Sequence, residues 1–550
     1  MTTATQRYFY IVFALMFAVG MHYYQYNYGG LGLTIPANLV TWSFVSILIG
    51  LALWQCSKTN KIYYSKLLIA TSICVLILFM PILYGNNELL KYSAQRLTGL
   101  IAGLVFLFSL YQINLAKSNL NQLVLWILAG VIVEGIICLV QEYVFIDQIW
   151  LQHPPEDRPY GIFKQPNVAS TFFVMGIALS AYLLAYNKYK SKYYQPVICL
   201  ASFLASWMVI LNSSKTATIS LFMVLALSAP TLYKRCGAKQ LRMWYLSILI
   251  GLSVPMIINI LDRGYSPREL VDNIRPTLYT ISLLLISKNI FTGTGYGSFG
   301  ISFHKAQADY IENHEFKANQ FGYNAGHPHN ELLLWGVEGG ILPVLALLSL
   351  ALFILRNYFS NGWRKGLFFT AIIFPAGFHT LTELPFYHSS IVFITFIFTL
   401  FLIEKTISPI EHKIRPGWLE FKITAITIPL ATVIFMITGM QTLTKLHQFE
   451  TSEFNDNKYL TEIVNPIAIV NGIEYAWFLQ PLLHKKSDFT SIRYFISEVE
   501  ALLKYWPRAK LYKELSDAYL LIGEKQLAIQ AYQTGKRLFP YSHEFQSPPL

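Results

Sequence analysis

The chain has 550 residues, of which 54% are hydrophobic and 13% are charged, and its mean hydropathy is +0.42. These values exclude an ordinary soluble globular domain and indicate a polytopic membrane protein. The net charge of +12 does not predict nucleic-acid binding, because the basic residues lie between apolar runs rather than in one patch. All five cysteines lie in apolar runs or basic loops, so we expect neither a disulfide nor a cysteine-based metal site.

Apolar runs of about the length that crosses a bilayer recur along the chain and predict an all-α fold with about thirteen membrane helices. We expect these helices near residues 8–24, 37–55, 66–84, 97–115, 122–146, 167–186, 196–212, 216–233, 242–260, 331–355, 366–382, 388–404 and 421–440. Lysine and arginine concentrate in alternate loops, and the positive-inside rule then places the N-terminus in the cytoplasm. Three polar segments share the opposite side: residues 147–166, residues 261–330 and everything after about residue 441.

These segments predict five consecutive parts of the chain. They are N-terminal membrane helices in 1–146, further membrane helices with a polar loop in 147–260, a large polar loop in 261–330, C-terminal membrane helices in 331–440, and a helical domain in 441–550.

The first polar segment contains the run from Arg158 to Asn167, which is rich in proline and glycine. This composition predicts a shaped turn that brings the amides of Gln165 and Asn167 to the start of the next helix, where they can bind a polar ligand. The alternative is a plain turn with a helix cap.

A polar break, Asn212 to Thr216, separates two apolar runs on the same side. Lys215 within it could meet an anionic headgroup, or it could be an ordinary lysine that reaches toward the membrane surface.

The segment from Asp262 to Asn330 is too long for a simple connection, and long polar insertions of this kind are usually functional. The region from Thr277 to Ile290 is predicted to form an interfacial helix, with Arg275 just before it. An arginine suits a phosphate because its planar guanidinium pairs with two oxygens. The glycine-rich run at 293–297 follows no strand, so it predicts a flexible turn rather than a dinucleotide site. Other ionisable residues of this loop are Arg263, Arg268, Lys288, His304, Lys305, His314 and Lys317.

The long loop ends in Gly326-His327-Pro328-His329-Asn330-Glu331, directly before the apolar run from Leu332 to Leu352. A histidine at a water-facing helix start can take a proton from a hydroxyl, because its ordinary pKa lies near working pH. In the alternative interpretation Asn330 caps the helix and both histidines are interfacial. His327, His329 and Glu331 could be considered as metal ligands, but no further ligand stands at a recognisable spacing, so we expect no metal.

A second short loop on that side, His379 to His388, contains Glu383. A carboxylate this close to the membrane is costly unless it is paired or hydrated, which supports a functional role. The alternative is a solvated loop carboxylate.

The tail after the last predicted membrane helix has the spacing of one tetratricopeptide-like helix pair. Its marker residues are Tyr512, Leu515, Tyr519, Gly523, Ala528, Tyr532 and Pro540. One such pair cannot bury both of its faces, so we expect it to pack on loops or neighbouring helices, either as a docking surface for a protein acceptor or as a cap over the site.

Taken together, the array of membrane helices, the Arg-Pro-Thr-Leu-Tyr run at 275–279, the Thr-Gly-Thr-Gly-Tyr-Gly run and His-Pro-His-Asn resemble the O-antigen ligase and polymerase superfamily, whose fold is GT-C-like. Two further runs resemble its branch of bacterial protein O-oligosaccharyltransferases, the pilin glycosylation ligases. They are Gly161-Ile-Phe-Lys-Gln-Pro-Asn167 and Glu383-Leu-Pro-Phe-Tyr387.

The resemblance implies an inner-membrane enzyme that transfers an oligosaccharide en bloc from undecaprenyl pyrophosphate to Ser or Thr of a pilin or other periplasmic protein. Its active site would face the periplasm, and neither a cofactor nor nucleic acid would take part. The resemblance assigns His329 as the catalytic base and Arg275 as the residue that holds pyrophosphate, and it implicates Gln165 and Tyr387. Where the family has Ser-Arg, this chain has Ser214-Lys215, which keeps the charge but loses the two-pronged hydrogen bonding.

Glycan- and pyrophosphate-binding candidates are therefore Arg275, Lys215, Gln165, Asn167, Tyr387 and Glu383, with His327, Asn330 and Arg158 as secondary candidates. No glycosidase-like carboxylate pair is apparent, so we expect inversion at the sugar. Two alternatives remain open: an O-antigen ligase or polymerase, which accepts a sugar hydroxyl, and a transporter of the lipid-linked glycan.

Overall fold

The computed structural model describes most of the chain. The described residues are 4–27, 29–59, 61–113, 115–144, 158–187, 193–263, 275–313, 325–407, 412–414, 418–452, 458–469 and 489–546. Three ionisable residues of the long loop named above, Arg268, His314 and Lys317, lie outside them.

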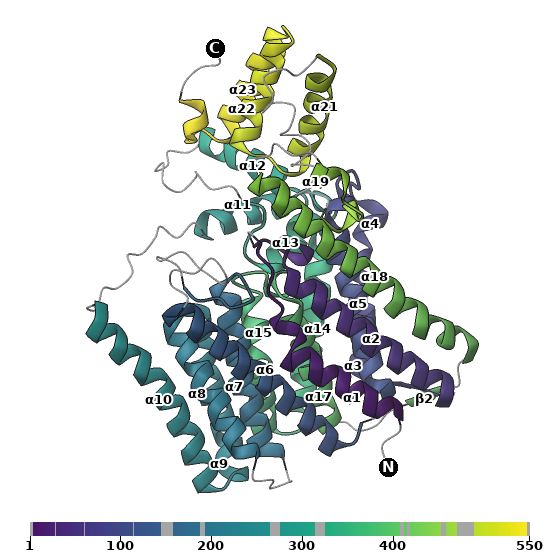
Figure 1. The fold of residues 1–550 in the computed structure, drawn as a ribbon, viewed down its shortest axis with the longest axis vertical. Helices are drawn as coiled ribbons and strands as arrows, with labels where there is room; N and C mark the ends of the chain where they lie inside the picture. Colours follow the sequence, from purple (N-terminus) through teal and green to yellow (C-terminus); the bar gives the residue numbers. More distant parts are fainter. Residues whose placement is uncertain are drawn as a thin grey trace. The chain divides into compact units, whose positions relative to one another are not determined.

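Helices dominate the described residues, as Figure 1 shows. This all-α architecture confirms the predicted fold class, because only helices satisfy every backbone group within one membrane-crossing segment. The longer helices are α1 (Ala4–Ala18), α2 (Pro36–Thr59), α3 (Lys66–Phe79), α5 (Ala94–Ile113), α6 (Lys117–Tyr143), α7 (Pro166–Tyr186), α8 (Tyr194–Leu211), α9 (Lys215–Arg235), α10 (Ala238–Arg263), α11 (Arg275–Lys288), α12 (Phe299–Asn313), α13 (Glu331–Gly339), α14 (Ile341–Phe359), α15 (Trp363–His379), α17 (Ser390–Ile407), α18 (Trp418–Thr451), α21 (Phe489–Tyr505), α22 (Ala509–Leu521) and α23 (Lys525–Leu538).

Short elements complete the fold. They include α4 (Pro81–Tyr84), α16 (Pro385–His388) and α19 (Lys458–Thr461), and an antiparallel pair of three-residue strands, β1 (Ile62–Tyr64) and β2 (His412–Ile414). Single 3-10 turns lie at Gly20–His22, Gly32–Thr34, Leu90–Ser93, Pro466–Ile469 and His543–Phe545.

Twelve segments of the described chain are long and apolar enough to cross a membrane. They agree with twelve of the thirteen predicted membrane helices. The remaining prediction, 366–382, corresponds to α15, whose 17 residues are at the short limit for crossing hydrocarbon.

One predicted membrane helix is wrong in its extent. The apolar run at 331–355 does not form a single helix, because the chain breaks at Gly340 into α13 and α14. Gly340 has a φ of 79°, which L side chains avoid, and a Cβ there would lie 2.6 Å from the carbonyl oxygen of Phe291. The His-Pro-His-Asn run therefore opens a separate nine-residue helix rather than the membrane helix itself.

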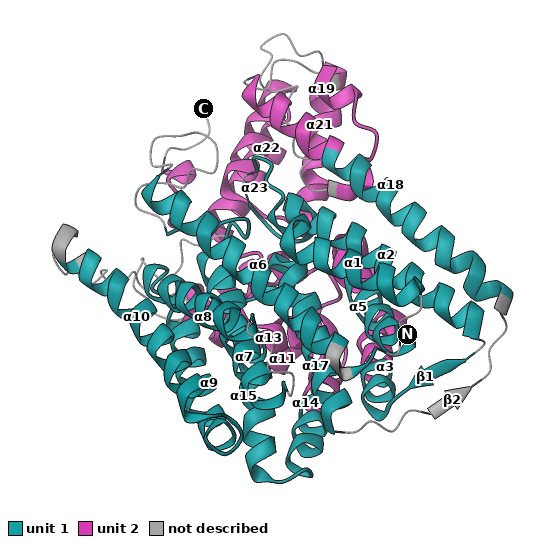
Figure 2. Ribbon diagram, turned by 60° about the horizontal axis from the view of Figure 1, so that its bottom comes forward, with its two compact units in different colours: residues 1–73, 99–267, 350–440 teal, residues 74–98, 268–349, 441–550 magenta. Residues whose placement is uncertain are grey.

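The helices group into two compact units, shown in Figure 2, and neither unit is continuous in sequence. Unit 1 comprises residues 1–73, 99–267 and 350–440, and unit 2 comprises residues 74–98, 268–349 and 441–550. Neither unit coincides with one of the five consecutive segments expected from the sequence.

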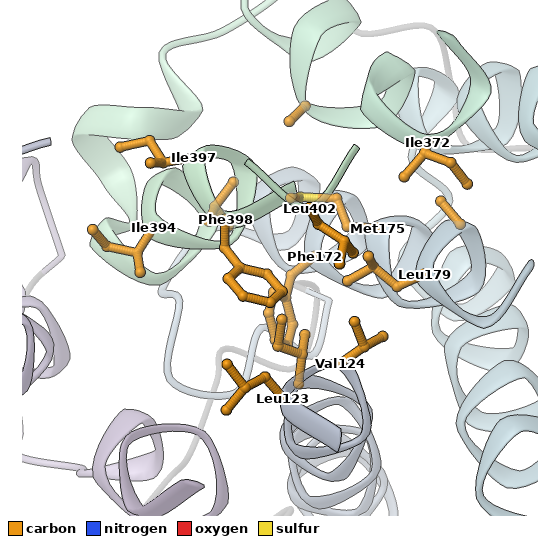
Figure 3. Close-up of a cluster of buried hydrophobic side chains, with 14 of the residues drawn as sticks. Leu123, Val124, Phe172, Met175, Leu179, Ile372, Ile394, Ile397, Phe398 and Leu402 are labelled. Carbon is orange, nitrogen blue, oxygen red and sulfur yellow. The ribbon is translucent and has the colours of Figure 1, made fainter. Parts of the chain in front are cut away.

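Unit 1 is a helical bundle built around α7. Nearly every side chain of α7 is buried, and the helix packs against α6, α8, α9 and α15. Figure 3 shows part of the core, to which α6, α7, α15 and α17 contribute Leu123, Val124, Phe172, Met175, Leu179, Ile372, Ile394, Ile397, Phe398 and Leu402. Lipid tails are as apolar as these side chains, so close packing rather than escape from water stabilises the bundle.

Unit 2 combines α11, α12 and α13 of the long loop with the helical tail. Helices α22 and α23 form the predicted pair, joined at Gly523, and α21 packs on α22. The second face of this pair is covered by α12, whose Ala308 belongs to the same apolar core as Phe495, Tyr512 and Phe539. The expectation that the tail packs on a neighbouring loop is confirmed.

Candidate active site

The predicted site residues lie in two groups, one in each unit. Unit 1 contains Arg158, Gln165, Asn167, Lys215, Glu383 and Tyr387, and unit 2 contains Arg275, His327, His329 and Asn330.

In unit 1, the loop before α7 is held by two buried side chains of α6. The Glu134 carboxylate accepts a hydrogen bond from the backbone N–H of Ile162 at 2.8 Å, and Gln141 accepts from the N–H groups of Tyr160 and Gly161. The other Glu134 oxygen lies 2.7 Å from Nδ1 of His22. The shape of this loop is thus set by polar groups on a membrane helix rather than by its own proline and glycine content alone.

Gln165 is the N-cap of α7, since its side-chain oxygen accepts from the backbone N–H of Val168 at 2.9 Å. The capping alternative is therefore confirmed for this oxygen. Among the described residues, neither the Gln165 amide nitrogen nor the Asn167 side chain has a hydrogen-bond partner. Both amides are partly exposed, so a ligand could still bind them.

Buried Asn212 connects three segments of unit 1. Its carbonyl accepts from Arg158 Nη1 at 2.7 Å, and its side-chain nitrogen donates to the Pro166 carbonyl and to the Ser170 hydroxyl. Arg158 therefore links the turn before α7 to the turn before α9. Lys215, the first residue of α9, follows the N-cap Ser214 and is exposed.

The loop from His379 to Ser390 reaches the same end of the bundle. His379 is buried with Nδ1 2.7 Å from the Thr171 hydroxyl of α7, and Thr382 lies 3.2 Å from Thr216 of α9, hydroxyl to hydroxyl. Glu383 is also buried, and one of its oxygens lies 3.9 Å from Nε2 of His388. Unit 1 thus brings the three predicted motifs, 158–167, 212–216 and 379–388, into one site.

A fourth segment at this site, formed by residues 22–27 and 29–35, was missed by sequence reasoning. Lys164 lies among three tyrosine rings, with its ammonium 5.7 Å from the Tyr24 centroid, 5.5 Å from Tyr26 and 5.3 Å from Tyr160. Burial lowers the pKa of this lysine. On the other side of the segment, the Gly30 carbonyl lies 3.2 Å from His388 Nδ1. The tyrosine-rich run after the first membrane helix was the available signal, since tyrosine favours the membrane interface.

In unit 2, the His-Pro-His-Asn run forms the start of α13. Asn330 is its N-cap and accepts from the backbone N–H of Leu333 at 3.0 Å. His329 has a φ of 52°, and its backbone N–H donates to Nδ1 of His327 at 3.3 Å. The centroids of the His327 and His329 imidazoles are 4.3 Å apart, so the two rings are in contact.

Helix α11 carries the arginine of this group. Arg275 is its first residue, and Tyr279, one turn later, has its hydroxyl 3.5 Å from the His329 carbonyl. Residues four apart lie on the same face of a helix. The predicted helix is thus present. It packs against both α12 and α13, and its buried side chains include Leu278, Ile281 and Leu285.

The position of α13 is set by a buried ion pair that sequence reasoning also missed. Glu338 pairs with Arg96 of α5, whose guanidinium lies over the rings of Trp335 and Tyr296 at 4.6 and 5.1 Å. The same carboxylate accepts from the N–H groups of Gly297 and Phe299. The sequence signal for this ion pair was Glu338 itself, a carboxylate within an apolar run.

The arrangement offers the elements of an anion-dependent group transfer. Unit 1 presents partly exposed amides and the exposed cation of Lys215. Unit 2 presents the His329 imidazole just before α13, which packs against α11, the helix that begins with Arg275. Cations and helix N-termini stabilise phosphate, and imidazole accepts a proton near neutral pH.

Comparison with known families gives three matches. Residues 159–184 match the model described as "Protein glycosylation ligase", residues 200–348 match "O-Antigen ligase", and residues 367–549 match "Virulence factor membrane-bound polymerase, C-terminal". No curated protein matches the chain. The matched ranges contain six of the predicted site residues, Gln165, Asn167, Lys215, Arg275, His329 and Glu383.

Proposed function

Since this chain belongs to the O-antigen ligase and polymerase superfamily, we propose that it is a protein O-oligosaccharyltransferase. In this proposal it moves an oligosaccharide from undecaprenyl pyrophosphate to a Ser or Thr hydroxyl of a pilin or another periplasmic protein. The observation that carries the choice of branch is the match of residues 159–184 to protein glycosylation ligases. This segment is held to Asn212 through the Pro166 carbonyl and to His379 through the Thr171 hydroxyl.

The donor supplies a good leaving group, so the reaction depends on charge stabilisation as the sugar–phosphate bond breaks. Arg275 at the start of α11 is proposed to hold the pyrophosphate, with Lys215 at the start of α9 as a second cation. Both residues stand at helix N-termini, where the helix dipole favours negative charge. Lysine contributes a point charge without the paired hydrogen bonds of an arginine.

The acceptor hydroxyl is a weak nucleophile, and His329 is proposed as the base that removes its proton. One oxygen–anomeric carbon bond forms as the bond to pyrophosphate breaks, and the proton moves to the imidazole. A single displacement of this kind inverts the sugar, so an anomer-resolved spectrum of the product is expected to show inversion. The scheme needs no metal ion, and transfer is therefore expected to persist in a chelator.

The amides of Gln165 and Asn167, together with Tyr387 and Glu383, are proposed to orient the glycan. Partly exposed amides suit sugar hydroxyls because they both donate and accept hydrogen bonds. We place the active side of the bundle in the periplasm of an inner membrane, since the basic loops lie at the opposite helix ends.

The direct test is mass spectrometry of periplasmic and pilin proteins from cells with and without this chain. A glycan mass that disappears from a Ser or Thr peptide on deletion supports the proposal. A change confined to lipopolysaccharide or to polymer length would instead favour an O-antigen ligase or polymerase, which the matches over 200–348 and 367–549 keep as the second candidate.

A further inference from the structure

A basic pocket lies at the end of unit 1 where α9 finishes and α15 begins. Its lining consists of Thr231, Lys234, Arg235, Asn361, Gly362, Trp363, Arg364 and Lys365, and its volume is about 290 Å³. The lining thus contains four cations and no carboxylate. We call this feature the α9/α15 pocket.

Two segments far apart in sequence form its walls. Residues 231–235 are the last turn of α9. Residues 361–365 comprise the end of the connection from α14 and the first three residues of α15. Helices α9 and α15 pack along each other, as Figure 2 also shows, and the Thr231 hydroxyl donates to the Arg364 carbonyl at 2.9 Å. The convergence of the cations is therefore a property of the packed bundle.

The pocket also contains the start of α15. Gly362 is the N-cap of this 17-residue helix, and no side chain caps it. The first backbone N–H groups of a helix have no partner within it and carry the positive end of its dipole. Four cationic side chains and these N–H groups converge, which is the chemistry that binds a phosphate.

The surroundings favour a phosphate that is attached to a lipid. Tyr233 and Trp363 beside the pocket are largely exposed, and Phe359 and Leu352 continue an exposed apolar surface along α14. Tyrosine and tryptophan favour the headgroup level of a bilayer, and basic pockets between membrane helices at the cytoplasmic side bind anionic headgroups. A free phosphate would use the cations but not this apolar surface.

We propose that the α9/α15 pocket binds the headgroup of an anionic phospholipid, with its acyl chains along the exposed side chains of α14. The positive-inside rule explains why basic residues occur at this end, but it does not require them to converge on a pocket with an uncapped helix start. The site is separate from the transfer reaction and does not depend on the proposed function.

The test compares lipid binding to the full chain in nanodiscs of phosphatidylglycerol and phosphatidylcholine. Native mass spectrometry counts the phosphatidylglycerol molecules that remain on the released protein. The variant Lys234→Gln/Arg364→Gln removes one cation from each wall. It is expected to weaken retention of phosphatidylglycerol about 25-fold, because each basic group near an anionic lipid contributes about fivefold.

The matched control is Lys239→Gln/Arg242→Gln, which removes two exposed cations of α10 that do not line the pocket. Retention is expected to stay within about twofold of the unmodified chain. Equal losses in both double variants, or no loss in either, would contradict the proposal. The charge-keeping variant Lys234→Arg/Arg364→Lys should retain phosphatidylglycerol, so a folding defect can be distinguished from loss of charge.

Inorganic phosphate distinguishes the two sources of the anion. The proposal expects phosphatidylglycerol to remain bound when inorganic phosphate is present in excess. Complete displacement by inorganic phosphate, with no preference for phosphatidylglycerol over phosphatidylcholine, would show a general anion site and overturn the lipid assignment.

Discussion

His329 has the same backbone setting as Lys164 and Ser213, which also have a positive φ directly before a helix N-cap. Its backbone is in the left-handed region, with a φ of 52°, and it directly precedes the N-cap of a helix. Residues other than glycine are uncommon there, although histidine and asparagine are enriched among them. Because Asn tolerates this backbone, it is the substitution that removes the imidazole with the least effect on the turn.

We therefore predict that His329→Asn lowers glycan transfer about 10²- to 10⁴-fold, the usual contribution of a general base. The measurement is mass spectrometry of the acceptor protein at equal levels of the chain in the membrane. His543→Asn is the control, because the His543 side chain is 83% exposed in the tail. Transfer within a few-fold of the unmodified chain would exclude His329 as the base.

His304 of α12 is a second histidine with an unusual environment. It is buried against the ring of Phe539 at 4.7 Å, and Gln307 and Arg508 are the polar groups that act on it. Burial lowers its pKa to about 4. In the unfolded chain the same group takes up a proton near pH 6.5, so acidification favours unfolding of this region.

The prediction is that the free energy of unfolding of the tail region falls by about 2 kcal/mol from pH 7 to pH 5 through His304. Glu514 opposes this trend, because burial raises its pKa to about 7 and its protonation on folding favours the folded state as the pH falls. The effect is isolated by pulse proteolysis of the full chain and its His304→Phe variant at several pH values. A difference between the two that does not vary with pH would refute it.

At the scale of elements, the turn at 293–297 shows how the end of α13 is fixed. The sequence predicts a flexible turn, whereas the structure packs it closely against other backbone. Gly297 has a φ of 85°, a Cβ there would lie 2.3 Å from the Leu89 carbonyl oxygen, and its N–H donates to Glu338. Only glycine satisfies both the backbone conformation and this approach.

A left-handed backbone costs an L residue about 1–2 kcal/mol. Because Gly297→Ala adds a steric clash to this cost, we expect it to destabilise the chain by more than that amount. Gly523→Ala is the matched control, because Gly523 has a nearly equal φ of 83° but open space around its Cβ position. Thermal unfolding of the purified chain should show a clearly larger decrease for Gly297→Ala. Equal decreases would mean that backbone conformation alone requires the glycine.

At the scale of the whole molecule, the tail depends on the long loop for its second covered face. Ala308 of α12 is buried in the tail's core, while Arg537 of α23 pairs at the surface with Asp309 and Glu312 of α12. The apolar contact excludes water, whereas water screens the exposed ion pairs and weakens them. The apolar contact should therefore dominate the docking of the tail on α12.

Ala308→Asp places an unpaired carboxylate in this core and is expected to make residues 489–546 sensitive to protease, at a cost of several kcal/mol in order of magnitude. Arg537→Ala should change the sensitivity little. The measurement is limited proteolysis of the full chain in detergent. Greater sensitivity in Arg537→Ala than in Ala308→Asp would show that the ion pairs hold the tail.

Much of the architecture could be read from local composition. Apolar runs of bilayer length predict helices because a backbone in hydrocarbon has few other ways to satisfy its polar groups. Tyr512, Leu515 and Tyr519 are three and four residues apart, so they lie on one side of a helix. A neighbouring helix must cover this apolar side, and the spacing therefore predicts a helix pair. The caps at Gln165 and Asn330 follow from neighbouring residues alone.

The contacts between distant segments could not be read in this way. Glu134 and Glu338 are visible in the sequence as carboxylates in apolar runs, but their partners, His22 and Arg96, lie more than a hundred residues away. The same holds for the tyrosines around Lys164 and for the break at Gly340. Local sequence specifies which backbone a segment prefers, whereas these features depend on which other surface it meets, and that follows from the packing of the whole helical array.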